Sequence, residues 1–153
     1  MPIDDSAQIA QIQPPECWVA LRSTNLGRLS FAVDGQPEIF PINYVTDGGT
    51  VVFRTAVHSR IASALDGRPV AFEVDGHTDG LAWSVIVKGA AREISGLYDS
   101  LAVAELPLHP EQGGHKDRVA RITPSEITGR RFTVADTHAW ETAVTSARRA
   151  APE

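Results

Sequence analysis

The chain has 153 residues, of which 42% are hydrophobic and 22% are charged. This composition is typical of one soluble globular domain, and it excludes a disordered chain, a collagen and a coiled coil. The 19 acidic and 14 basic residues give a net charge of -5, which disfavours nucleic acid as the main partner because phosphate-backbone binding usually needs a basic face.

The sequence has no feature of a membrane or exported protein. No apolar run is long enough to span a membrane. Residues 1–13 contain acidic residues and lack the basic start and apolar centre of a signal peptide. The single cysteine, Cys17, has no partner for an internal disulfide. We therefore expect a cytoplasmic protein that does not associate with membranes.

The N-terminal part combines a polar arm with a short helix. Residues 1–13 form the polar arm, and a helical pattern follows over residues 16–21. We expect one domain over residues 14–138 and a C-terminal tail over residues 139–153.

Alternating apolar and polar residues predict a series of β-strands. The expected strands are 27–33, 38–45, 50–55, 70–75, 81–94, 118–123 and 130–134. Asp34-Gly35 and Asp47-Gly48-Gly49 predict tight hairpin turns between the first three strands. Pro41 cannot donate a ladder hydrogen bond, so the second strand is expected at a sheet edge at that point. Gly89 predicts a bend in the fifth strand.

Other segments interrupt this β pattern. Ser59 is a candidate cap for a short helix that ends at Gly67. Residues 76–80 and 107–117 are expected to be loops, and residues 98–106 are a second helix candidate.

The turns between strands predict a mainly β fold. Since consecutive strands are joined by tight hairpins, the sheet is expected to be antiparallel. A six-stranded closed or half-open barrel with short helices fits the pattern. An open α+β sandwich is the alternative, and a parallel doubly wound sheet is disfavoured. The strand over residues 81–94 has apolar residues on both faces, more than one small barrel needs, which predicts a homodimer.

The segment that ends the third strand carries the clearest chemical signal. Arg54 and Thr55 end that strand, and Ser59 and Arg60 begin the helix after it. Free N–H groups at a helix start and two guanidinium groups can together bind a phosphate. The alternative is an ordinary helix cap beside two surface arginines.

Other polar residues carry weaker signals. His109 and His115 flank a loop rich in proline and glycine, which lacks the firm scaffold of a metal site, so no metal is expected. Cys17 has no paired base that would make it a nucleophile. No side chain is identified as an obligatory catalytic acid or base.

Six segments together match a known family in their order and spacing. They are Gly27-Arg28-Leu29-Ser30, Pro41-Ile42-Asn43-Tyr44-Val45, Val52-Phe53-Arg54-Thr55, His58-Ser59-Arg60, residues 83–91 and residues 127–131. With these segments the chain resembles the pyridoxamine 5'-phosphate oxidase-like family, and within it the small branch that includes the nitroimidazole-resistance reductases.

The resemblance implies a split β-barrel that binds FMN in a groove between the two subunits of a homodimer. The cofactor-binding residues that it implies are Pro41, Ile42, Asn43, Tyr44, Phe53, Arg54, Thr55, Ser59, Arg60 and Trp83. Much of the contact from the strand with Pro41 is expected to be through the backbone, and Trp83 is expected to reach across the dimer. Ile61 stands where the vitamin B6 oxidases carry a lysine, so pyridoxamine phosphate is not the expected substrate.

The resemblance implies a flavin-dependent oxidoreductase. Hydride or electrons would pass from a nicotinamide or another donor, through the flavin, to an unidentified small molecule. The alternative is a binding module without turnover, for FMN, the deazaflavin F420, haem or pyridoxal phosphate. A third interpretation is a dimeric barrel with an empty groove.

Overall fold

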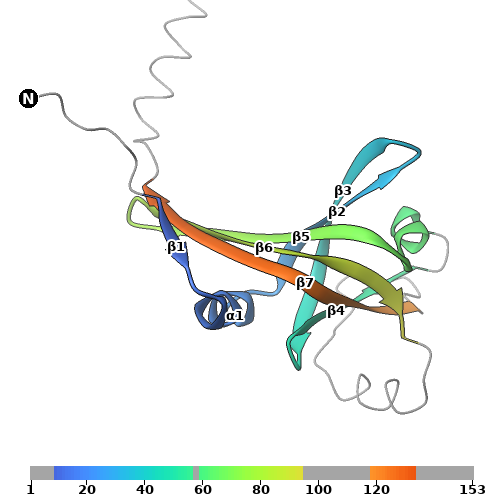
Figure 1. The fold of residues 1–153 in the computed structure, drawn as a ribbon, viewed down its shortest axis with the longest axis horizontal. Coiled ribbons are helices and arrows are strands. Elements are labelled where there is room, and N and C mark those ends of the chain that lie inside the picture. Colours follow the sequence, from blue (N-terminus) through green and yellow to red (C-terminus); the bar gives the residue numbers. More distant parts are fainter. Residues whose placement is uncertain (1–8, 57–58, 95–117, 134–153) are drawn as a thin grey trace, which may run out of the picture.

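A ring of antiparallel strands forms the body of the molecule (Figure 1). The computed structural model describes residues 9–56, 59–94 and 118–133. The described strands are β1 (Ala10–Ile12), β2 (Leu26–Val33), β3 (Gln36–Asp47), β4 (Thr50–Thr55), β5 (Asp66–Thr78), β6 (Leu81–Glu93) and β7 (Arg118–Thr133). The ring order is β2-β3-β4-β7-β6-β5, and it closes because β5 pairs with β2. The six-stranded antiparallel barrel expected from the sequence is confirmed.

Three two-residue turns connect neighbouring strands. They join β2 to β3, β3 to β4 and β5 to β6, and all their residues have positive φ: Asp34, Gly35, Gly48, Gly49, Asp79 and Gly80. Consecutive left-handed residues suit a hairpin turn because their twist matches that of the strands. The first two turns were predicted. The loop predicted over residues 76–80 is wrong in extent, since β5 continues to Thr78 and only Asp79-Gly80 form the turn.

The last strand is longer than the sequence pattern predicts. The two strands expected over residues 118–123 and 130–134 are one continuous strand within the described residues, β7. The register with β6 shifts where Lys88 faces Glu126 and Gly89 faces Pro124, so Ser125 is an extra residue on β7. This bulge accommodates a proline within the strand. Gly89 is required there because a Cβ would collide with the carbonyl of Thr123, which agrees with the irregularity predicted at this glycine.

The polar arm contains a strand that was not expected from the sequence. β1 pairs with residues 129–131 of β7, and Ile12 is buried. Helix α1 (Pro14–Arg22) follows directly and begins with two prolines, as the pattern around residues 16–21 predicted. The helix approaches β7 closely at Gly129, where a Cβ would lie 2.7 Å from the Cys17 sulfur.

The core fills the ring and is covered at one end by α1. Its largest fully buried side chains include Tyr44, Phe53, Phe72, Leu21 and Leu29. The rings of Tyr44 and Phe72 meet edge to face with centroids 4.8 Å apart. The Tyr44 hydroxyl donates a hydrogen bond to the carbonyl of Leu21 in α1, and burial raises the pKa of Tyr44. This bond ties the helix to the barrel.

The segment after Ser59 is a short 3-10 helix, η1 (Arg60–Ala64), and the α-helix predicted to continue to Gly67 is wrong. Gly67 instead belongs to β5, with φ +89. The predicted helix over residues 98–106, the loop over 107–117 with its two histidines, and the tail over 139–153 lie outside the described residues. Within the described part of the chain, neither helix could cross a bilayer, being too short and too polar.

Replacing Tyr44 with phenylalanine tests the link between α1 and the barrel. The ring volume is kept, but the buried hydrogen bond to Leu21 is lost. We expect the free energy of unfolding in urea to fall by about 1–2 kcal/mol. Ser125→Ala removes an exposed hydroxyl bond to Lys88 and is expected to change it by less than about 0.5 kcal/mol. Equal effects of the two substitutions would show that the Tyr44 bond does not anchor the helix.

Candidate functional site

Thr55 and Ser59 form the centre of the candidate site. Thr55 ends β4 and is only 3% exposed, and Ser59 immediately precedes η1. Their hydroxyl oxygens lie 2.6 Å apart, so one donates to the other. Ser59 therefore bonds to Thr55, and its side chain does not cap the helix.

The predicted contribution of a helix start to anion binding is not supported. η1 has five residues and is a 3-10 helix, so it lacks the aligned peptide dipoles that a longer α-helix provides. Any anion at this position would have to be bound mainly by side chains.

Arg60 is held by an acidic side chain from another strand. Its Nη1 donates to Oε1 of Glu38 on β3. The Arg60 side chain is 72% exposed, whereas that of Glu38 is 20% exposed. We call Glu38, Thr55, Ser59 and Arg60 the rim cluster, since they gather where β4 ends.

Glu38 is a member of the site that was not among the residues predicted from the sequence. A signal for it was present, because the predicted hairpin at Asp34-Gly35 places Glu38 opposite Phe31. Glu38 thus shares the inward face of β3 with buried Ile42 and Tyr44. An acidic residue at a core-facing position needs a partner, and that partner is Arg60.

Arg54 leaves β4 on the face opposite to Thr55. Neighbouring strand residues point to opposite faces, and Val52, on the same face as Arg54, packs with Val45, Ile94 and Val119. The Nε atom of Arg54 is buried and has no hydrogen-bond partner among the described residues. A buried donor without a partner costs free energy, so an acceptor that reached this atom would be stabilising.

The predicted cofactor strand offers mainly its backbone and two side chains. Ile42 and Tyr44 point into the core and are at most 6% exposed, and Phe53 on the neighbouring strand is fully buried. Pro41 and Asn43 lie on the other face of β3. Side-chain contact from Ile42, Tyr44 or Phe53 would require the core to open, which leaves backbone contact as the prediction for these three.

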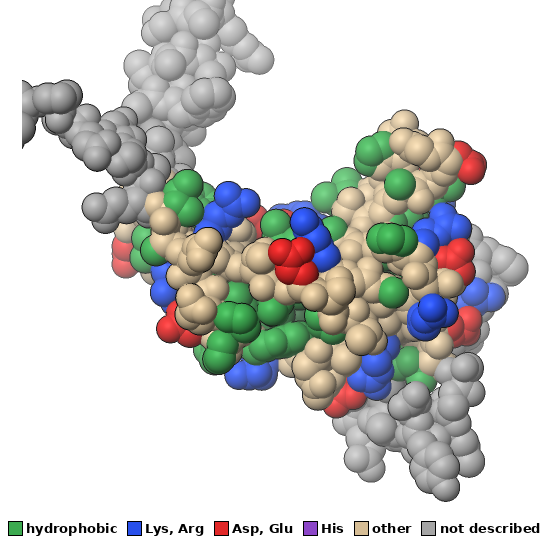
Figure 2. All heavy atoms as spheres, viewed as in Figure 1, with side chains coloured by type: hydrophobic (Ala, Val, Ile, Leu, Met, Phe, Trp, Pro, Cys, Tyr) green, Lys and Arg blue, Asp and Glu red, His purple; other side chains and the backbone are tan. Residues whose placement is uncertain are grey.

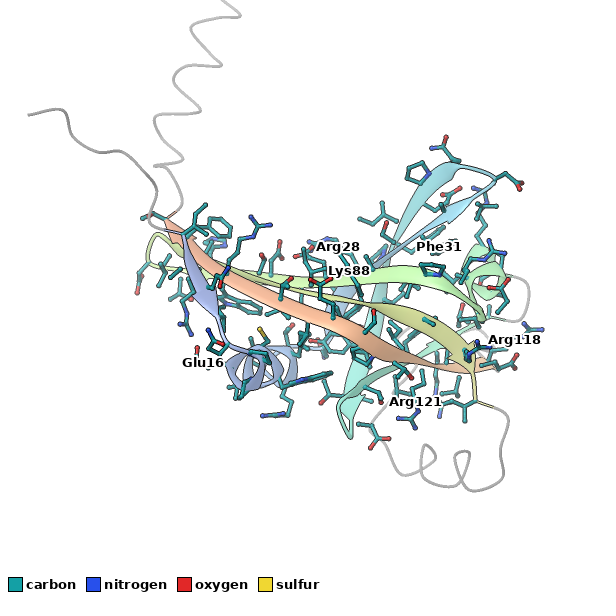
Figure 3. All side chains as sticks on the ribbon, viewed as in Figure 1. Glu16, Arg28, Phe31, Lys88, Arg118 and Arg121 are labelled. Atoms are coloured by element: carbon teal, nitrogen blue, oxygen red, sulfur yellow. The ribbon has the colours of Figure 1, made fainter. Side chains whose placement is uncertain are left out.

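Trp83 lies far from the rim cluster within one chain. It pairs with Arg131 of β7, whereas Arg54 pairs with Val119. These two β7 positions are separated by roughly 40 Å of strand, at about 3.3 Å per residue. In Figure 3, Arg118, the partner of Thr55, marks one end of β7, while Glu16, which pairs with Arg131 at 3.6 Å, lies toward the other end. One chain therefore does not bring Trp83 to Arg54.

Comparison with known proteins identifies the family. A family model described as pyridoxamine 5'-phosphate oxidase matches residues 13–131. The chain belongs to this family. The resemblance seen in the sequence is thereby confirmed. A comparison with curated protein sequences found no significant match.

Solved structures from actinobacteria are similar in both fold and sequence. An FAD binding protein from Mycobacterium smegmatis is 39% identical, with a TM-score of 0.74, covering 81% of this chain and 98% of that one. A protein from Corynebacterium glutamicum is 33% identical, with a TM-score of 0.72 and coverages of 84% and 96%. A conserved protein of unknown function from Corynebacterium diphtheriae is 30% identical, with a TM-score of 0.71 and coverages of 82% and 98%.

Proposed function

We propose that this family member is a flavin-dependent oxidoreductase that binds a phosphorylated flavin between the two subunits of a homodimer. The observation that carries this proposal is the similarity to the FAD binding protein of M. smegmatis, which extends over nearly all of that protein. FMN is the cofactor predicted from the sequence, FAD is the one named for this neighbour, and the deazaflavin F420 is the alternative.

The donors of the candidate site fit a phosphate-bearing ligand. The buried Nε of Arg54 has no partner among the described residues, and the hydroxyl pair of Thr55 and Ser59 adjoins Arg60. Charged donors form the stronger hydrogen bonds to phosphate oxygens. Arg54, Thr55, Ser59 and Arg60 would hold the phosphate, and the backbone of residues 41–44 would lie beside the ring system.

A second copy of the chain would complete the site. Trp83 on β6 and Arg54 on β4 pair with opposite ends of β7 in one chain, so only Trp83 of a second chain could approach a flavin held at the first. Exposed apolar side chains are available for such a contact: Ile9, Val19, Leu26, Ile39 and Leu81. Figure 2 shows hydrophobic side chains gathered over α1. An isologous dimer is the commonest way to cover surfaces of this kind.

The redox chemistry would belong to the cofactor. When bound, a flavin supplies hydride and electron transfer between a donor and an acceptor. The chain's own residues would bind the phosphate, orient the ring and exclude water from it. We place this activity in the cytoplasm with a small-molecule substrate, in line with the sequence expectations.

The absorbance of the purified protein tests the function. We expect a yellow protein, or uptake of added flavin, with the flavin band bleached by a nicotinamide donor without oxygen. A yellow protein that no donor bleaches would favour a binding module without turnover. A colourless protein that takes up no flavin would contradict the proposal.

Alanine substitution of Arg54 or Arg60 tests the phosphate contacts. Each charge-assisted hydrogen bond contributes about 1.5–3 kcal/mol, so the affinity for a phosphorylated flavin should fall by about 10- to 150-fold. Riboflavin, which lacks the phosphate, should bind equally to parent and variant, and Arg22→Ala on α1 is the matched control. Equal losses for FMN and riboflavin would show that the arginine acts through folding.

Replacing Trp83 with phenylalanine tests the contribution of the second subunit. The variant should keep a mass of two chains by light scattering, because most of the apolar volume is retained. The fluorescence of the bound flavin should rise, since a nearby indole quenches it, and affinity should weaken by about 1 kcal/mol. Unchanged fluorescence and affinity in a folded dimer would assign Trp83 to the core alone.

A further inference from the structure

We propose that Glu38 determines which flavin the rim cluster accepts, favouring the esterified diphosphate of FAD over the phosphomonoester of FMN. This inference rests on the proposed function, and it makes Glu38 a specificity-determining residue. The carboxylate of Glu38 holds Arg60, one of the two arginines expected to bind the phosphate.

The charge of the rim cluster is balanced before any ligand binds. Arg60 contributes +1 and Glu38 contributes -1 to an ion pair, while Thr55 and Ser59 are neutral and bond to each other. The cluster therefore offers a phosphate hydrogen bonds without net positive charge. Among the described residues, further positive charges nearby are those of Arg54, on the opposite face of β4, and of Arg118 on β7, which pairs with Thr55 and lies 3.8 Å from Glu93.

Packing restricts how far Glu38 could move away from a ligand. Its side chain is 20% exposed and lies on the inward face of the β2–β3 hairpin, opposite Phe31. Phe31 in turn stacks on Phe40 with ring centroids 5.8 Å apart. A phosphate that reaches the exposed Arg60 would therefore lie near a carboxylate that stays in place.

Arg60 can bind both groups at once. A guanidinium has five N–H donors in a planar fork, and Glu38 takes Nη1 as its donor. The remaining donors can reach a phosphate oxygen, with Glu38 fixing the orientation of the arginine. The carboxylate thus positions Arg60 and at the same time repels excess negative charge.

The two cofactors differ in the charge that they place on one phosphorus. A phosphomonoester carries about -1.5 to -2 at pH 7, because its second pKa is near 6. Each phosphorus of FAD has two ester or anhydride links and a single ionised oxygen, so its charge is -1. FAD spreads its charge over two phosphorus atoms, and only one of them can be the nearest to Glu38. Because repulsion falls with distance, it is larger for FMN, which places its whole phosphate charge on that one phosphorus.

The replacement Glu38→Gln isolates this charge. Glutamine keeps the shape and one acceptor oxygen for Arg60 but removes the negative charge. Dissociation constants for FAD, FMN and riboflavin would be measured by flavin fluorescence, with the full-length protein at pH 7.5. Glu126→Gln is the matched control, because it removes an exposed carboxylate from β7 far along the chain.

We expect the parent protein to bind FAD more tightly than FMN. In the Glu38→Gln variant FMN should gain about 5- to 10-fold in affinity and FAD less, so that the ratio of FMN to FAD affinity rises, since the removed repulsion depends on the phosphate charge and its distance from Glu38. Riboflavin binding and all affinities of the Glu126→Gln variant should not change.

The outcomes separate this inference from the proposed function. If flavins bind but Glu38→Gln leaves the ratio of FMN to FAD affinity unchanged, the role of Glu38 is refuted while flavin binding stands. An equal change for riboflavin would also refute it, because Glu38 would then act through folding. If no flavin binds to the parent or the variant, the proposed function itself fails.

Discussion

The pairing of β7 with two strands at once is the constraint on which the structure depends. β7 pairs with β6 along residues 120–133 and with β4 along residues 118–122. This double pairing closes the ring and covers the edges that β4 and β6 would expose in an open barrel. It also fixes how far the rim cluster lies from Trp83 within one chain, because Thr55 ends a strand held by one end of β7 and Trp83 pairs with the other end. The bulge at Ser125 lets one strand follow both partners.

The local parts of the fold could be predicted from the sequence, but the long-range pairings could not. Asp34-Gly35 and Asp47-Gly48-Gly49 specify hairpins through backbone conformation alone, and both form. β1 was not predicted because it has only three residues, of which Ile12 alone is buried. These residues form a strand only because they pair with the free side of β7. Two strands were predicted in place of β7 because a proline such as Pro124 normally ends a strand. In the structure, the bulge at Ser125 accommodates this proline and the strand continues.

The candidate site shows the same division between local and distant information. Arg54, Thr55, Ser59 and Arg60 could be singled out because they are close in sequence at a strand end. The partner of Arg60 lies 22 residues away, and only the strand register brings Glu38 to it. The bond between Ser59 and Thr55 likewise replaced a predicted helix cap, since a hydroxyl beside another buried hydroxyl has a closer partner than the backbone of a short 3-10 turn.

The edge of β3 shows why prolines occur in a strand that the site needs. Val33 and Gln36 flank a two-residue turn, so they form a hydrogen-bonded pair of the ladder. The even-numbered residues 38, 40 and 42 of β3 therefore direct their backbone N–H and C=O groups toward β2. The odd-numbered residues of β3 direct theirs away from β2. Within the described residues, 36–43 pair with β2 only and pairing with β4 begins at Tyr44. Pro37 and Pro41 thus remove donors from the free edge and none from the ladder. A foreign strand needs alternating donors and acceptors, and this edge lacks half of its donors. Its carbonyl oxygens remain, so the edge disfavours strand addition while it can still accept hydrogen bonds from a ligand.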